Sequence, residues 1–193
     1  EIMPSLVGSE MCIRDRYDSS ETGWQAYKTT KDYIKALYDA GYNTVRIPVT
    51  WGSHINDDYT IDEAWINRVQ EIVDYCVDQD MYAIVNIHHD GAANHDDRGN
   101  NTPACWLDTY SQNIEKVYQK YEGVWNTIAN RFKDYDEHVI FESMNEVTDA
   151  HGTATNEDDA VLNALNQLFI NTVRATGSNN TCLLYTSDAA DEL

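Results

Sequence analysis

The stretch WINRVQEIVDYCVDQDMYAIVNIHHD, from Trp65 to Asp90, contains a helical pattern followed directly by a strand pattern. Its first half repeats apolar residues at the period of an amphipathic helix, at Trp65, Val69, Ile72, Val73 and Cys76. Its second half is a short apolar run, Tyr82 to Ile87, which ends at polar residues. A helix followed by such a strand is typical of a βα unit in a parallel sheet.

The same alternation continues on both sides of this stretch. Upstream, a helix with Ile34, Leu37 and Tyr38 on one face stops at Ala40-Gly41 and is followed by a strand over Thr44 to Val49. Downstream, a helix from about Ile114 to Phe132, a strand over Val139 to Glu142 and a helix from about Val161 to Thr172 are predicted. Because parallel strands joined by helices need right-handed crossovers, the three predicted strands should be neighbours in one sheet.

Composition restricts the kind of partner. The chain of 193 residues is 42% hydrophobic and 11% aromatic, which is typical of a folded domain. A formal charge of −20 disfavours nucleic acid and anionic membranes as partners, and no apolar run has the length of a membrane span. A neutral polysaccharide is compatible with this charge, since aromatic side chains can stack on sugar rings.

The cysteines indicate neither a disulfide framework nor a zinc site. They stand far apart, without a CxxC pair, at Cys12, Cys76, Cys105 and Cys182. We expect Cys76 and Cys105 to be ordinary thiols, and we expect no cofactor.

Polar residues follow each predicted strand, where the loops of a parallel α/β fold open. The three ends carry Arg46 and Trp51, then His88-His89-Asp90, then Glu142 to Glu146. This pattern is typical of a site built across strand tips. Arg46 lies within a strand, where a buried guanidinium needs a carboxylate partner, so either a structural ion pair or an active-site contact is expected there.

Glu146 is the candidate for a catalytic carboxyl group. A glycosidase needs two carboxyl groups around the scissile bond, one of which keeps its proton near neutral pH. Glu146 follows a strand end directly, and the amide of the neighbouring Asn145 could bind a sugar 2-hydroxyl. The alternative is that Asn145 and Glu146 only open a turn.

The tandem histidines suggest a second kind of site. His88 and His89, together with Asp90 and His95, could form a metal-dependent hydrolase. Adjacent strand residues point to opposite faces, however, so the two histidines are poorly placed to bind one ion, and no metal site is predicted.

Indole rings near the strand tips could offer platforms for sugar rings. Trp24, Trp51 and Trp106 lie in predicted loops on that side, with core packing as the alternative for each. Trp65 and Trp125 lie on the buried stripes of helices and are assigned to the core.

Three segments together resemble the motifs of glycoside hydrolase family 5 cellulases, in order and spacing: Asn43-Thr-Val-Arg-Ile-Pro-Val-Thr-Trp51, Asn86-Ile-His-His-Asp90 and Phe141-Glu-Ser-Met-Asn-Glu146. The similarity spans about Glu21 to Asn180. It implies an α/β fold, a truncated (β/α)8 TIM barrel that contains about strands 2 to 4 and their flanking helices.

The resemblance also implies an activity and roles for residues. Glu146 would be the general acid/base, and Arg46 would orient the nucleophile. His88, His89 and Asn145 would contact sugar hydroxyls or catalytic groups. The nucleophile of the family lies on the seventh strand, which this chain does not reach. The implied enzyme is a secreted, extracellular, endo-acting retaining β-glycanase that cleaves β-1,4 bonds of cellulose or related β-glucans without a cofactor or metal.

Four alternatives to that activity stay open. A β-mannanase, xylanase or xyloglucanase of the same fold, or a non-catalytic carbohydrate-binding fragment, would carry the same motifs. In every case the partner is a β-glycan polysaccharide, and the full-length protein is expected to be a monomer. A signal peptide is not visible in this chain.

Both ends of the chain resemble translated sequencing-adapter peptides. These segments are residues 1–16 and 182–193, and we exclude them from the expected native domain. The predicted partial catalytic domain is therefore 17–180.

Overall fold

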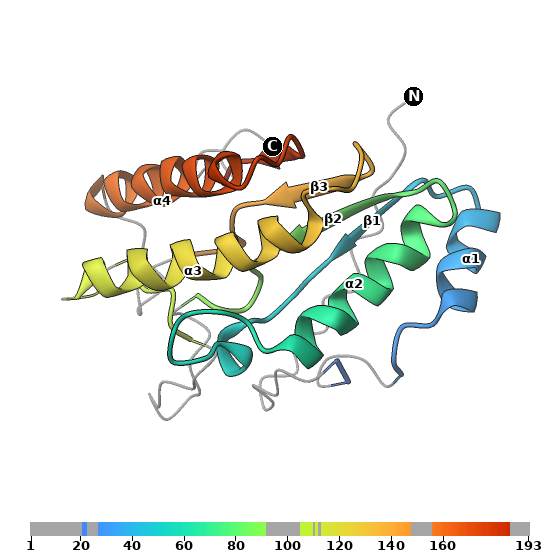
Figure 1. Cartoon of the computed structure of the whole chain (residues 1–193), viewed down its shortest axis with the longest axis horizontal. Coiled ribbons are helices and arrows are strands. Elements are labelled where there is room, and N and C mark those ends of the chain that lie inside the picture. The colour runs from blue at the N-terminus through green and yellow to red at the C-terminus, as the bar shows by residue number, and fades with distance from the viewer. Residues whose placement is uncertain are drawn as a thin grey trace.

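The structure is a computed structural model, and it describes residues 21–22, 27–91, 105–109, 111, 113–147 and 156–185. Its centre is one parallel sheet with the strand order β1-β2-β3-β4 (Figure 1). The strands are β1 (Thr44–Ile47), β2 (Tyr82–Asn86), β3 (Val139–Glu142) and β4 (Thr181–Leu183). The predicted parallel neighbours are thus confirmed.

Strand β4 corrects the prediction of three strands. Thr181, Cys182 and Leu183 pair in parallel with Ile140, Phe141 and Glu142 of β3. A strand of three residues is too short to show a period of its own, so the sequence pattern did not reveal it. The adapter origin of residues 182–193 stays a prediction.

Four α-helices are described, at the predicted places: α1 (Lys31–Asp39), α2 (Glu63–Val77), α3 (Ile114–Phe132) and α4 (Asn156–Ala175). Side chains cap two of their starts, because Thr30 Oγ1 accepts from Tyr33 N and Asp62 Oδ1 accepts from Trp65 N. A short 3-10 helix, η1 (Gly52–His54), follows β1 and was not predicted. None of these described helices is both long enough and apolar enough to cross a membrane.

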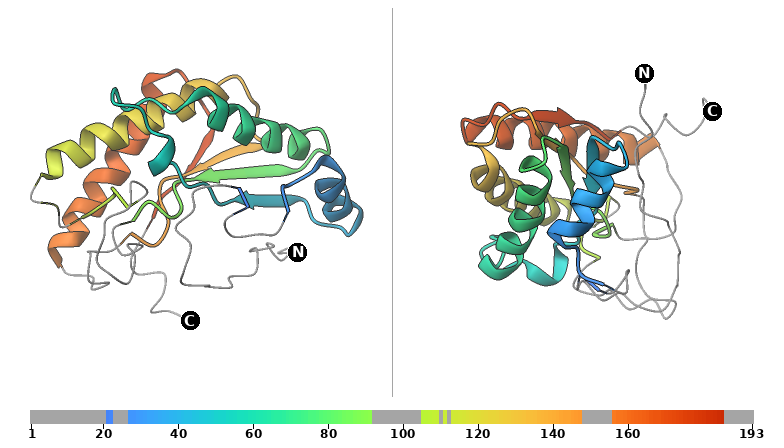
Figure 2. Two further views of the ribbon diagram at one scale, coloured as in Figure 1. Left: turned by 90° about the horizontal axis from the view of Figure 1, so that it is seen from below. Right: turned by 90° about the vertical axis from the view of Figure 1, so that its right-hand side faces the viewer.

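Helices α2, α3 and α4 lie against one face of the sheet (Figure 2). The core forms there: Phe141 of β3 lies 5.8 Å, between ring centroids, from Trp125 of α3, which lies 4.4 Å from Phe169 of α4. All three rings are fully buried. Because side chains alternate along a strand, Glu142 points to the other face of the sheet. Glu142 therefore lies on the face that these three helices do not cover.

A glycine in α3 allows the loop that follows η1 to approach the helix closely. A Cβ atom on Gly123 would lie 2.6 Å from Tyr59 Cβ and 2.8 Å from the Tyr59 carbonyl oxygen, closer than packed atoms come. Glycine inside a helix costs about 1 kcal/mol relative to alanine, so the helix accepts this cost for the close approach. The loop after β1 is thereby held against α3.

Candidate active site

The register of the sheet brings Arg46 and Glu142 to the same face. Arg46 pairs with Ile84, which pairs with Ile140, and these three residues form one row across β1, β2 and β3. Asn86 and Glu142 pair with each other two residues further along. Since side chains repeat every two residues in a strand, Arg46, Asn86 and Glu142 project from one face.

An ion pair joins the first and third strands. Arg46 Nε donates to Glu142 Oε2 at 2.6 Å, and Arg46 Nη2 donates both to Glu142 Oε1 and, at 2.8 Å, to Asn145 Oδ1. The Asn86 amide donates to Glu142 Oε1 at 3.3 Å. The guanidinium is thus bound by two of its nitrogens to a carboxylate, the strongest common geometry for this pair. It holds the Asn145 side chain in place.

Glu142 is a candidate site residue that the sequence pattern does not single out. The sequence predicts a carboxylate partner for Arg46 without identifying it, and it predicts Glu142 only as the end of a strand. The register of the sheet identifies Glu142, because it lies two residues beyond Ile140, which is in the row that contains Arg46. Both alternatives for Arg46 are met in part: the contact is an ion pair, and it also positions a candidate site residue, Asn145.

Glu146 lies in the segment 143–147 after β3, and its neighbours on both sides are held in place. Met144 and Val147 are buried, and Asn145 is held by Arg46. Glu146 itself is exposed and has φ 43, in the left-handed region that a residue with a side chain rarely adopts. Strained backbone of this kind persists where the surrounding structure determines it, and it concentrates at functional sites.

The carboxylate of Glu146 interacts electrostatically with Tyr185, which follows β4. Burial raises the pKa of the Tyr185 hydroxyl, and the negative charge of Glu146 raises it further. Tyr185 follows β4 and its backbone N–H donates to Ser143 Oγ at 3.0 Å. The candidate acid/base therefore lies at the same end of the sheet as the carboxyl ends of the strands.

His88 and His89 lie beside this ion pair. Val49 N donates to Asn86 Oδ1 at 3.3 Å, which orients the Asn86 amide so that its Nδ2 donates to His88 Nδ1 at 3.1 Å. His88 therefore carries its proton on Nε2. Burial, then the charges of His89 and Arg46, lower the pKa of His88 to about 3. Burial and Arg46 lower that of His89 to about 4. Both rings are neutral near pH 7.

Acid should destabilise the chain through these histidines. Because each folded-state pKa lies below the ordinary value of 6.5, the unfolded chain binds more protons between about pH 4 and pH 6.5. The free energy of unfolding falls as the pH drops through that range, by up to about 1.4 kcal/mol per pH unit for each histidine. Urea unfolding at about pH 4.5 and about pH 6.5 should show a smaller acid loss in a His88→Asn/His89→Asn variant.

A third histidine provides the control for that measurement. Asp136 raises the pKa of His138, so His138→Asn should leave the acid loss unchanged or enlarge it. The titration of Asp90 is common to all the chains and cancels in the comparison. An acid loss that is equal in the double variant and the parent chain would show that these two rings do not control it.

The predicted indole platforms have different outcomes. Trp51 is fully buried, and its Nε1 donates to the Asn86 carbonyl at 2.8 Å, so the expectation of an exposed ring is wrong there and it packs in the core. Trp106 is half-buried and stays a candidate platform. Trp24 lies outside the described residues. Trp125 is in the core as predicted, whereas Trp65 is only partly buried at the edge of the core.

The described residues contain no cluster of three His, Cys, Asp or Glu side chains that could hold a metal ion. The rings of His88 and His89 are in edge contact, 4.3 Å between centroids, while His95 lies outside the described residues. Cys76 and Cys105 are buried thiols, as expected. Burial raises the pKa of the Cys76 thiol to about 12.

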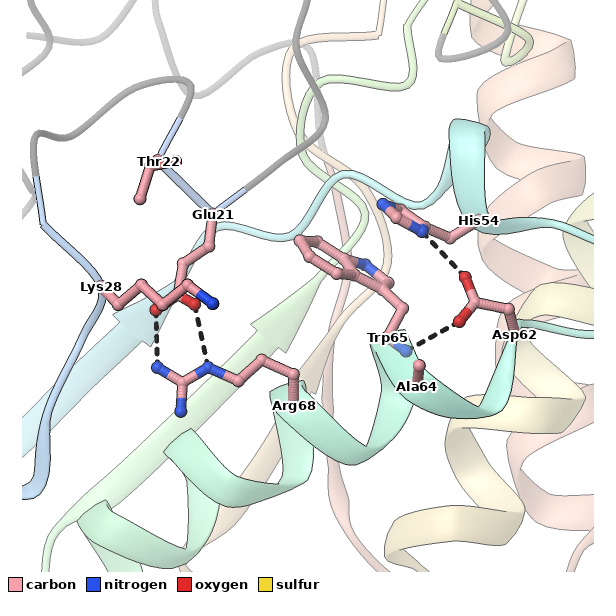
Figure 3. A pocket seen from close by; sticks show the side chains of 8 residues that line it. All are labelled: Glu21, Thr22, Lys28, His54, Asp62, Ala64, Trp65 and Arg68. Atoms are coloured by element: carbon pink, nitrogen blue, oxygen red, sulfur yellow. Dashed lines mark hydrogen bonds and ion pairs between the residues drawn. The ribbon is translucent and has the colours of Figure 1, made fainter.

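A pocket of about 340 Å³ lies beside the N-terminal half of α2 (Figure 3). Two pairs of its polar side chains contact each other: Arg68 Nε donates to Glu21 Oε2 at 2.9 Å, and His54 Nδ1 lies 2.8 Å from Asp62 Oδ2. The His54 ring stacks on Trp65 at 4.0 Å. These contacts connect the segment before α1 to α2, and the pocket is separate from the Arg46–Glu142 pair.

The chain is similar to known proteins in sequence. The family model described as cellulase (glycosyl hydrolase family 5) matches residues 8–191. Endoglucanase A of Ruminococcus albus is 40% identical over 170 residues, which is 84% of this chain but 43% of that protein. The chain thus spans less than half the length of this curated relative.

Solved structures agree with the sequence comparison. The chain is similar to a family 5 xyloglucanase from Paenibacillus pabuli, with a TM-score of 0.74 and 40% identity over 83% of this chain and 44% of that one. It is also similar to a GH5-4 broad specificity endoglucanase from Clostridium acetobutylicum, with a TM-score of 0.72 and 43% identity over 84% of this chain and 48% of that one. The four parallel strands and their helices are part of the (β/α)8 barrel of this family. The chain belongs to glycosyl hydrolase family 5, the cellulase family.

Proposed function

We propose that this chain is part of an endo-acting retaining β-glycanase that hydrolyses β-1,4-glucosidic bonds in cellulose or a related β-glucan. The observation that carries the proposal is the Arg46–Glu142 pair, whose guanidinium holds Asn145 directly beside the exposed Glu146. This is a fixed amide next to a free carboxyl group at the strand tips, as a glycosidase requires.

The residues divide the reaction between them. Glu146 protonates the leaving glycosidic oxygen and later, as a carboxylate, takes a proton from the attacking water. Asn145 donates to a hydroxyl of the sugar through the amide nitrogen that Arg46 leaves free. His88 offers Nε2–H as a neutral donor. The nucleophilic carboxylate would come from the seventh strand of the barrel, by the resemblance to the family.

The polymer is proposed from the relatives. The relative from Ruminococcus albus is named an endoglucanase, and the two proteins of known structure are described as a xyloglucanase and a broad specificity endoglucanase. Each of these names denotes a glucan backbone or leaves room for one, which supports β-glucan over mannan or xylan for this chain. A net charge of −20 suits an uncharged polymer. We further propose secretion and a monomeric full-length enzyme.

A polymer panel tests this proposal. The coding sequence, extended to the length of the relatives, should yield an enzyme that releases oligosaccharides from carboxymethyl cellulose and xyloglucan, faster than from mannan or xylan. Activity confined to mannan or xylan would overturn the glucanase assignment. A metal chelator should leave the activity unchanged, and its loss would favour the metal-dependent alternative. Binding of cello-oligosaccharides without product release would favour a non-catalytic binding protein.

A further inference from the structure

Asp90 is a fully buried carboxyl group that the proposed reaction does not use. Both of its oxygens accept from Trp51 N, at 3.2 and 3.1 Å, and Oδ1 also accepts from Trp106 Nε1 at 2.6 Å. Its backbone carbonyl accepts from Leu107 N at 2.8 Å. Asp90 thus connects the segment after β1 with the segment 105–109.

The surroundings act on the Asp90 carboxyl group in opposite directions. Burial raises the pKa of Asp90 to about 7, and the hydrogen bonds from the Trp51 backbone, from the Trp106 indole and from the Gly52 backbone, with the charge of Lys120, act against that rise. Lys120 also places its Nζ 5.0 Å from the centroid of the Trp106 ring. The indole is therefore fixed at its N–H edge by a carboxyl group and on a face by a cation.

Trp106 lies next to the carboxyl end of β2, where a ring of fixed orientation could bind a ligand. The segment 105–109 is joined to the end of β2 by the bridge between Gly91 and Leu107, directly after His88, His89 and Asp90. Leu107 is fully buried, whereas the Trp106 ring stays half-buried beside it. An aromatic ring whose orientation is already set loses little entropy when it binds a ligand.

We propose that Asp90 is a positioning residue, which locks the indole of Trp106 at the edge of the strand-tip site so that the ring can receive a glucose unit of a β-glucan chain. The locking of the indole is a property of the chain alone. The contact with glucose rests on the proposed β-glycanase function.

The indole N–H resonance of Trp106 tests the first half. Trp106→Phe assigns this resonance in a ¹⁵N spectrum by removing it. In the parent chain we expect a downfield indole proton that exchanges slowly with water. Asp90→Asn replaces one accepting oxygen by an NH2 donor and removes the charge, so the N–H groups of Trp51 and Trp106 must share one neutral acceptor. The resonance should therefore move upfield, and its exchange should become faster by at least about tenfold. Asp57→Asn, the same change at an exposed position, should leave it in place.

Cellotetraose titration tests the second half. Asp90→Asn and Trp106→Phe should each weaken binding by about tenfold relative to the parent chain and to Asp57→Asn. An indole signal that Asp90→Asn does not move would overturn the lock, whatever the affinity. A moved signal with unchanged cellotetraose affinity would overturn the glucose contact.

The two proposals can fail separately. If the parent chain binds no cellotetraose while Asp90→Asn still moves the indole signal, the lock stands and the glycan-binding function fails. If Asp90→Asn does not fold, the parent chain decides alone: an indole proton of Trp106 that exchanges as fast as free indole overturns the lock, and a protected one supports it.

Discussion

Replacing Arg46 by methionine should lower the free energy of unfolding by about 3 kcal/mol, because removal of one partner leaves a largely buried charge unpaired. The side chains of Arg46 and Glu142 are 22% and 16% exposed. Without the guanidinium, the Asn86 amide at 3.3 Å is the one donor that Glu142 keeps among the described residues, and Asn145 Oδ1 loses the donation from Arg46. Urea unfolding, followed by circular dichroism, measures the difference.

An exposed pair supplies the control. Lys35 Nζ bonds to Asp39 at 2.6 Å, with side chains 56% and 57% exposed, so Lys35→Met removes one cation at a cost of only about 0 to 1 kcal/mol. A double variant, Arg46→Met with Glu142→Leu, removes both charges and should recover most of the lost stability. Equal losses for Arg46→Met and Lys35→Met would show that the Arg46 pair is no stronger than a surface contact.

The helices and strands could be predicted closely because their patterns are local. The apolar stripe from Ile114 to Phe132 gave α3 its observed bounds, and β3 was predicted residue for residue. Strand β1 was predicted to reach Val49 but ends at Ile47. The reason lies in the next residue, since Pro48 has no N–H to continue the ladder.

The contacts of the site could be predicted only in part, because they depend on register and packing between distant segments. The sequence showed that Arg46 needs a carboxylate, but its partner lies 96 residues away and is selected by the pairing of β1 with β2 and of β2 with β3. The burial of Trp51 likewise depends on the Asn86 carbonyl that its indole N–H reaches. No local pattern contains that information.

Replacing Glu146 by glutamine should abolish most of the activity of the extended enzyme on polymeric glucan. Glutamine keeps the shape of the side chain but can neither give nor take the proton, and positioned acid/base groups contribute about 10² to 10⁴ in rate. Glu137→Gln is the matched control, because Glu137 is exposed and lies before β3, whereas Glu146 follows the opposite end of this strand. Its kcat on carboxymethyl cellulose should equal that of the parent enzyme.

The role of Glu146 in double displacement predicts more than a loss of rate. An aryl glycoside with a good leaving group needs no acid for the first step, so Glu146→Gln should still form the glycosyl-enzyme and then stall, because no base activates water. Azide needs no base, so it should restore turnover and yield a glycosyl azide with retained β configuration. An enzyme that shows neither the stall nor the rescue uses Glu146 to hold the loop between β3 and α4 rather than to transfer protons.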